Sequence, residues 1–396
     1  MPEEKRNKEN RISTFVINLV ASAINGTTPN VTADSSDWDE IIEFAKKQSV
    51  LNIIAYSCEK LQEKPDAKTM KFLKEFRMQK MVVEAQQEIE FCDAMDKLEK
   101  MQIKHMPLKG YIVKNLYPSP DMRTMGDLDI LVEKEKCDEI VAAFVSDGFT
   151  NCADGDLHSN VERGNAYIEF HRSMVNEKHE TLSAYFGDGF SRAKLSDGYS
   201  FRYELAKEDL YIFLIAHIAK HYRYGGTGIR SLLDLYVYRR AYPEMDYDYI
   251  RSELEKINLR IFQEKIEKIA DDWYSGNFDG EFDTVSSYII SGGVYGTESA
   301  PLLNTFIQDN QGNVDSRTKA RLWFQTVFPG KELMTTRYPI LKKCIFLLPF
   351  FWIIRFFDTL IRTPQNFRRS VRNTTEILKI DDALVNAQRD SGIDKL

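Results

Sequence analysis

The sequence predicts an α+β protein in which a small mixed sheet is embedded between helical regions. Strand-like runs are confined to about residues 103–200. Before and after that segment, apolar residues recur every three or four positions, which is the period of a helix. Neither G-x-G-x-x-G nor G-x-x-x-x-G-K-[ST] occurs, so we expect neither a dinucleotide-binding fold nor a P-loop.

The length of 396 residues favours two to three domains. We expect an N-terminal helical region over 1–102, the mixed-sheet core over 103–200, a helical domain over 201–330, and an apolar and basic C-terminal helix with a tail over 331–396. The net charge of −7 gives no strong nucleic-acid signal. Five widely spaced cysteines without a C-x-x-C pair indicate reduced thiols and a cytoplasmic protein.

The N-terminal region contains four helical patterns. The apolar run 12–24 follows a charged start and can be taken for a signal peptide, but acidic residues before it and polar residues within it favour an amphipathic helix. Further helices are expected from about Trp38, over 50–61, and from Pro65 to about Lys104. We expect this region to pack against the sheet and cover it.

Two carboxylates open a strand-like run in the core, Gly126–Val132. Side chains alternate along a strand, so Asp127 and Asp129 share one face while Leu128 points into the core. Like charges on one face repel each other unless a cation lies between them. Oxygen ligands in this arrangement suit Mg²⁺.

A third acid, Glu169, lies in a second strand-like run, 166–174. Ile168 and Phe170 face one side of that run, and Glu169 and His171 face the other. If the two strands pair side by side, Glu169 joins the two aspartates. Three such carboxylates can hold two metal ions around a phosphate.

Three sequence patterns together carry a family resemblance. Leu108-Lys109-Gly110, the run R-x-x-G-D-L-D-I-L-V from Arg123, and I-E-F-H over 168–171 resemble the uncharacterised nucleotidyltransferase-like family of the DNA polymerase β-type nucleotidyltransferase superfamily. The superfamily usually has Gly-Ser where this chain has Lys109-Gly110. That difference removes a serine hydroxyl that often contacts the triphosphate.

The resemblance implies transfer of a nucleoside monophosphate from an NTP, ATP among them, to an acceptor hydroxyl with release of pyrophosphate. It implies Mg²⁺, with Mn²⁺ as the alternative ion, held by Asp127, Asp129 and Glu169. The residues implied or inferred to bind the nucleotide are Lys109, Gly110, Arg123, Gly126, His217 and His221.

His217 and His221 lie four residues apart, on one face of a predicted helix. Three interpretations stay open: a pair packed at a helix interface, a pair lining the substrate pocket, and part of a zinc site. The resemblance includes an H-x-x-x-H and an R-x-x-x-D here. Arg230 and Asp234 are most simply an intrahelical ion pair.

The C-terminal region contains eleven uncharged residues, 344–354, which are too few to span a bilayer. Arg362, Arg368, Arg369 and Arg372 follow. The segment is either a helix buried against the rest of the chain or an interfacial helix that makes peripheral membrane contact through 344–372 at the inner face. We expect residues 380–396 to form a solvated tail.

Two other function classes compete with nucleotidyl transfer. A metal-dependent glycosyltransferase also uses D-x-D to bind a sugar nucleotide, but the third acid and the preceding Lys-Gly turn favour the nucleotidyltransferase. A non-catalytic nucleotide-binding or interaction protein would keep the fold without turnover. No motif specifies the acceptor or an oligomeric state.

Overall fold

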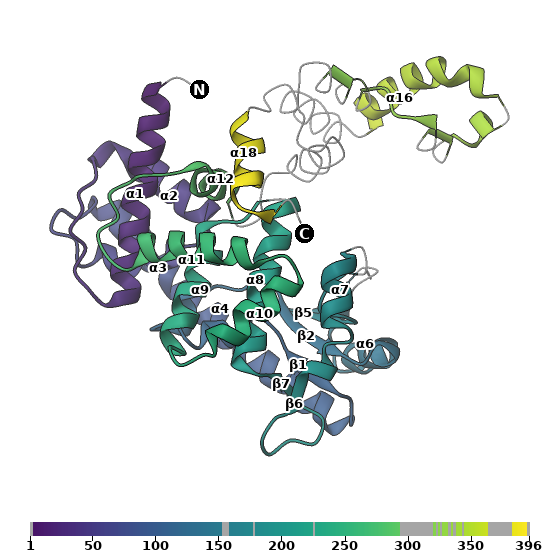
Figure 1. Ribbon diagram of the computed structural model, residues 1–396, viewed down its shortest axis with the longest axis horizontal. Coiled ribbons are helices and arrows are strands. Elements are labelled where there is room, and N and C mark those ends of the chain that lie inside the picture. Colours follow the sequence, from purple (N-terminus) through teal and green to yellow (C-terminus); the bar gives the residue numbers. More distant parts are fainter. Residues whose placement is uncertain are drawn as a thin grey trace.

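The computed structural model describes residues 3–152, 158–176, 179–224, 226–293, 320–321, 324, 327–331, 334–335, 338–342, 344–362 and 382–393. A five-stranded mixed sheet and a two-stranded sheet are embedded among helices (Figure 1). The predicted α+β class is confirmed.

The N-terminal helices are α1 (Glu3–Asn25), α2 (Trp38–Lys47), α3 (Leu51–Cys58) and α4 (Ala67–Lys100). Val16 and Leu19 of α1 are fully buried, so the run that resembles a signal peptide is a core helix here. Helix α4 packs against the sheet, whereas α1 to α3 share one hydrophobic cluster with the later helices. The expected cover of the sheet therefore comes from α4 rather than from the whole region.

The main sheet has the spatial order β1-β2-β5-β4-β3. Its strands are β1 (His105–Pro107), β2 (Leu128–Val132), β3 (Thr150–Asn151), β4 (His158–Arg163) and β5 (Ala166–His171). The strands β2 and β5 run parallel, and the other neighbours are antiparallel. Gly164, with a φ of 61°, forms the predicted tight turn between β4 and β5. The sequence 154–156 lies outside the described residues.

The two faces of the sheet differ in chemistry. Leu128 and Ile130 of β2, and Ile168 and Phe170 of β5, are fully buried in a cluster with α4 and with α6 (Cys137–Ser146). Because side chains alternate, the acidic residues of both strands lie on the opposite face. That face is the one that the later helices approach.

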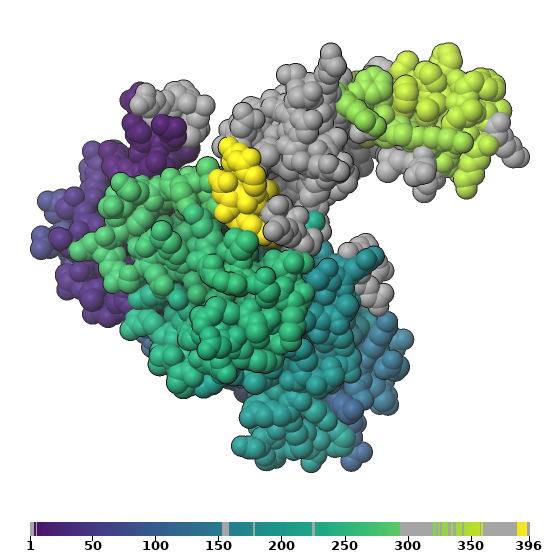
Figure 2. All heavy atoms as spheres, in the orientation of Figure 1, coloured from purple at the N-terminus to yellow at the C-terminus, as the bar shows by residue number. Residues whose placement is uncertain are grey.

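Further elements follow the sheet strands or connect them. They are α5 (Gly110–Lys114), α7 (Glu180–Phe186), β6 (Ala193–Leu195), β7 (Tyr203–Leu205), α8 (Lys207–Tyr224), α9 (Ile229–Ala241), α10 (Tyr247–Lys256), α11 (Arg260–Tyr274) and α12 (Thr284–Gly292). The antiparallel pair β6–β7 was not predicted from the sequence. In Figure 2 the green helices adjoin the teal and blue segment that carries the sheet.

The two C-terminal helices differ in how far their apolar side chains are exposed. In α16 (Leu348–Arg362), Phe350 and Ile353 are 64% and 58% exposed, so the described chain leaves this apolar face uncovered. Among the described residues, no helix has both the length and the apolar character needed to cross a membrane. Arg368, Arg369 and Arg372 lie outside the described residues.

The expectation of a solvated tail is wrong for residues 382–393. Helix α18 (Asp382–Asp390) packs against α12, and Ala387 is buried. The hydroxyl of Tyr222 donates a hydrogen bond of 2.8 Å to the carbonyl of Ala387. An apolar helix face buried in this way removes hydrocarbon from water, which offsets the cost of ordering the chain end.

Candidate functional site

The parallel pairing of β2 and β5 gathers the three predicted acids. The register places Asp129 directly beside Glu169. Ligand oxygens of Asp127, Asp129 and Glu169 all lie within 4.8 Å of one another. Such a group of carboxylates can hold hard divalent cations, as the alternation of the sequence predicted.

Asp129 is the buried member of the group, with 6% of its side chain exposed. Its Oδ1 lies 2.6 Å from Nε2 of His171 and 3.3 Å from Nζ of Lys109. Burial alone would raise the pKa of Asp129, but Lys109 and His171 outweigh it and hold the pKa well below its ordinary value. Asp129 is therefore ionised at neutral pH.

Asp127 lies in a different environment, exposed at the mouth of the pocket. Partial desolvation there, and then repulsion by Asp129, raises the pKa of Asp127 above its ordinary value. Lys109 opposes this shift. The repulsion that the sequence predicted is thus concentrated on Asp127, and a bound cation would relieve it.

Lys109 reaches Asp129 from a strained backbone. It has a φ of 40° and a ψ of −107°, immediately before the first residue of α5. A non-glycine residue rarely adopts positive φ, and such strain is kept where the surrounding structure holds it in place. Lys109 is therefore fixed above the carboxylates rather than free to extend into solvent.

Position 110 requires a glycine because the side chain of Arg123 lies close to its backbone. A Cβ at Gly110 would lie 2.5 Å from Nη1 of Arg123. The guanidinium of Arg123 in turn donates to both oxygens of Asp234 on α9, at 2.8 and 2.9 Å. The hydroxyl of Tyr117 donates to the same carboxylate at 2.7 Å. Asp234 thus ties α9 to the sheet domain, and Nη1 of Arg230 donates a hydrogen bond of 2.9 Å to the carbonyl of Thr124.

One pocket of about 350 Å³ joins the sheet to α8 and α9. Its lining includes every residue that the sequence placed at the site: Lys109, Gly110, Arg123, Gly126, Asp127, Asp129, Glu169, His217 and His221. A wider hollow of about 800 Å³ lies beside α11 and α12 and contains none of these residues. The chemistry, rather than the size of the hollow, therefore identifies the site.

His217 and His221 form a pair on α8, with ring centroids 4.4 Å apart. Burial, and then the charge of Lys109, holds the pKa of His217 well below its ordinary value, so its imidazole is neutral. The two groups of potential metal ligands found among the described residues do not include this pair. The geometry favours the pocket-lining interpretation over the zinc site.

Three pocket residues were not assigned from the sequence. Lys220 lies between the two histidines of α8, and burial, with Lys109 nearby, lowers its pKa to about 8. Alternation along the strand places His171 on the face of Glu169 but indicates no role for it. His158 comes from β4, opposite His171 in the antiparallel register. Of these three residues, only His171 can be placed at the site from the sequence, by the alternation of side chains along its strand.

The comparison with known families gives one match. A family model described as an uncharacterised nucleotidyltransferase matches residues 34–275, which is more than half of the chain. The matched range includes the sheet, the pocket, and helices α8 and α9. No curated protein and no solved structure gives a significant match.

Proposed function

Since the chain belongs to the uncharacterised nucleotidyltransferase family, we propose that it is a metal-dependent enzyme that transfers a nucleoside monophosphate from an NTP to an acceptor hydroxyl, with pyrophosphate as the other product. One observation carries the proposal. Asp127, Asp129 and Glu169 converge within 4.8 Å at the wall of a pocket that Lys109 and Lys220 also line. We propose a cytoplasmic location, in keeping with five free cysteines.

The carboxylates fit Mg²⁺, or Mn²⁺, by their chemistry. All three offer hard oxygen ligands, and burial and then repulsion by Asp129 raise the pKa of Asp127, a repulsion that a bound cation would relieve. A bound divalent cation supplies charge neutralisation at the phosphates and favours ionisation of an acceptor hydroxyl. Asp127 and Asp129 would hold the ion on the nucleotide side, and Glu169 the ion on the acceptor side.

The protein's own cations would bind the phosphate chain. Lys109 is fixed above Asp129, and Lys220 projects into the pocket from the opposite wall. Preorganised positive charge stabilises the negative charge that develops on phosphate oxygens during transfer. Gly110 and Gly126 let the backbone approach the nucleotide closely. Arg123, held by Asp234, positions this wall rather than moving with the substrate.

The remaining pocket residues are suited to bind the nucleoside and to accept the proton of the attacking hydroxyl. His217 and His221 line the helical wall, where neutral imidazoles can contact the base or ribose. Glu169 lies on the acceptor side and can take the proton of the attacking hydroxyl, with His171 beside it at 3.3 Å. The attack forms the new phosphoester bond at the α-phosphorus, and the bond to the pyrophosphate oxygen breaks.

The proposal is tested by incubating the purified chain with each α-labelled NTP, Mg²⁺ or Mn²⁺, and fractionated cell extract. We expect label to enter an acceptor and pyrophosphate to appear in equal amount. Asp129→Asn should abolish both, while Asp147→Asn, at a surface ion pair with Lys97, should abolish neither. Release of a nucleoside diphosphate from a sugar nucleotide would support the glycosyltransferase instead. No calorimetric heat with any NTP would support a non-catalytic protein.

A further inference from the structure

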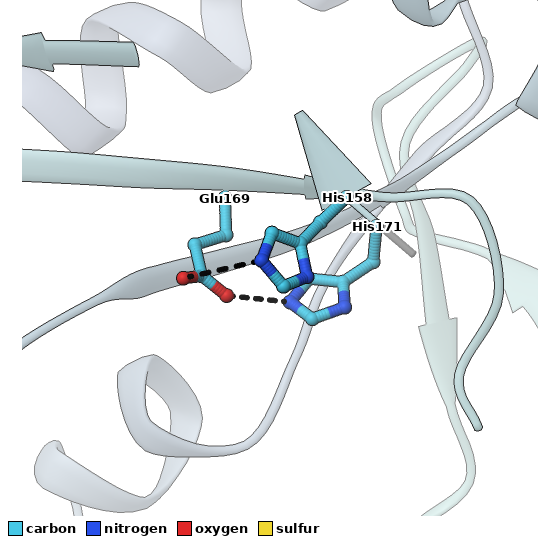
Figure 3. Close-up of side chains that lie close together, drawn as sticks. All are labelled: His158, Glu169 and His171. Carbon is cyan, nitrogen blue, oxygen red and sulfur yellow. Dashed lines mark ion pairs between the residues drawn. The ribbon is translucent and has the colours of Figure 1, made fainter. Parts of the chain in front are cut away.

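Two histidines converge on the carboxylate of Glu169. Nε2 of His171 lies 3.3 Å from Oε2 of Glu169, and Nε2 of His158 lies 3.8 Å from Oε1 (Figure 3). Each oxygen of the carboxylate therefore faces one imidazole. The ligand atoms of the three residues all lie within 4.8 Å of one another.

We propose that His158, Glu169 and His171 form a second metal position, selective for a first-row transition ion such as Zn²⁺ over Mg²⁺. Two imidazoles and one carboxylate are the donor set that such ions prefer, whereas Mg²⁺ prefers oxygen ligands. The position differs in chemistry from the Asp127–Asp129 position, and Glu169 belongs to both. Binding of this ion can occur without a nucleotide, so the inference does not depend on nucleotidyl transfer.

The spacing of the ligand atoms fits a bound ion. Two ligands held about 2.0–2.1 Å from a tetrahedral Zn²⁺ lie about 3.3 Å apart. Nε2 of His171 and Oε2 of Glu169 already have this separation, and the 3.8 Å between Nε2 of His158 and the other oxygen, Oε1, exceeds it by about half an ångström. His158, with 30% of its side chain exposed, has room to make that adjustment. His171 would exchange its contact with Asp129 for the ion.

The position is built on paired strands. His158 on β4 lies opposite His171 on β5, and Asn160 lies opposite Glu169. Hydrogen-bonded neighbouring strands hold their side chains more firmly than loops do, which favours a defined coordination geometry.

A buried polar atom beside the three residues supports the site independently. Asn160 is only 5% exposed, and its Oδ1 has no hydrogen-bond partner among the described residues. By alternation Asn160 shares a face with His158. Buried polar oxygens are rarely left without a partner, so Oδ1 of Asn160 is available to an ion or to a metal-bound water at this place. An amide oxygen can serve either as a weak ligand or as an acceptor for a metal-bound water.

The experiment uses the full chain, stripped with a chelator and titrated with Co²⁺ as a spectroscopic probe and with Zn²⁺ by calorimetry. We expect one Co²⁺ ion per chain to give visible absorption bands typical of nitrogen ligation at low coordination number. Zn²⁺ should displace this Co²⁺, whereas Mg²⁺ at the same concentration should not. His158→Gln should weaken Zn²⁺ binding by about tenfold or more. His171→Asn should do the same, and circular dichroism would verify that each variant is folded.

Two controls separate this position from its neighbours. His221→Gln removes a histidine that lines the same pocket from α8, and it should leave the Co²⁺ spectrum unchanged. Asp127→Asn removes a ligand of the acidic position alone, and it should also leave the spectrum unchanged. Wild-type binding by the His158→Gln variant, an equal loss in the His221→Gln variant, or displacement of Co²⁺ by equal Mg²⁺ would each overturn the proposal. None of these outcomes bears on whether label transfer occurs.

Discussion

Asp127→Asn and Asp129→Asn should change the stability of the metal-free protein in different directions, although both should abolish transfer. Asp127 immediately precedes the first residue of β2 and Asp129 lies within that strand, and the two have different neighbours. Asp129 is buried between Lys109 and His171, whereas Asp127 is exposed and repelled by Asp129 and Glu169. Neutralising Asp129 removes a favourable interaction, and neutralising Asp127 removes an unfavourable one.

The magnitude for Asp129→Asn follows from its two charged contacts. A hydrogen bond to a charged group contributes about 1.5–3 kcal/mol, and removing one partner of a buried pair costs about 3–5 kcal/mol. Asparagine keeps one oxygen that can still accept a hydrogen bond, so we expect a loss of about 2–4 kcal/mol. For the exposed Asp127, we expect a change within about 0.5 kcal/mol, or a small gain in stability.

The assay is thermal denaturation at pH 7 in the presence of a chelator. A loss of about 3 kcal/mol should lower the Tm by about 6–12 °C if the cooperative unit has about 150–250 residues, and by less if the whole chain unfolds as one unit. The depressed pKa of Asp129 makes its contribution fully present above its unfolded pKa of about 3.9, and the contribution is lost as the pH falls through the folded pKa. The Tm difference between wild type and Asp129→Asn should therefore shrink as the pH falls below about 4.

Asp147→Asn, which removes a surface carboxylate, is the matched control and should leave the Tm nearly unchanged. Equal Tm losses in Asp127→Asn and Asp129→Asn, or a larger loss in Asp127→Asn, would refute the division of charge between the two positions.

Three further predictions concern other parts of the chain. Gly110→Ala should lower the free energy of unfolding, measured by urea denaturation, by about 1–3 kcal/mol and should weaken NTP binding. The reason is that the new Cβ collides with the guanidinium of Arg123, which Asp234 holds in place, and unchanged stability would contradict this. NTP affinity, measured by calorimetry, should fall as the pH rises through about 8, where Lys220 loses its charge. The Lys220→Met variant should bind NTP weakly at every pH. The same fall in affinity in that variant would exclude Lys220 as the group that titrates. Through α16 and the arginines after it, the full chain should co-sediment with anionic vesicles at low salt and dissociate at high salt, whereas a Phe350→Ser, Ile353→Ser double variant should stay in the supernatant. Equal behaviour of the two would exclude α16.

The acidic side of the site could be predicted because it depends on local rules. Alternation along a strand fixes the common face of Asp127 and Asp129, and the same rule places Glu169 on the face of its strand away from Phe170. What the sequence could not supply was the pairing partner of β2. The neighbouring position of β5, with Asp129 beside Glu169, was a condition of the prediction, and the structure confirms it.

The basic side of the site depends on long-range contacts, which local patterns do not encode. The spacing of Arg230 and Asp234 suggests an intrahelical pair, yet the structure pairs Asp234 with the guanidinium of Arg123, 111 residues earlier in the chain, while Arg230 donates to the carbonyl of Thr124. Lys220 shows no motif of its own, and its position depends on how α8 packs. The same limit explains the error at the C-terminus, where the polar composition of 380–396 concealed the apolar face of α18.

The pocket is therefore a joint product of the sheet and the helices that follow it. The sheet supplies the carboxylates, and α8 supplies Lys220 and the histidine pair. Asp234 of α9 holds Arg123, Arg123 packs on Gly110, and Gly110 follows the strained Lys109 that reaches Asp129. A change at Asp234 of α9 can thus displace Lys109 without altering Asp127, Asp129 or Glu169. Because positive charge near Asp129 depends on this chain of contacts, docking of α9 should govern phosphate binding more than metal binding.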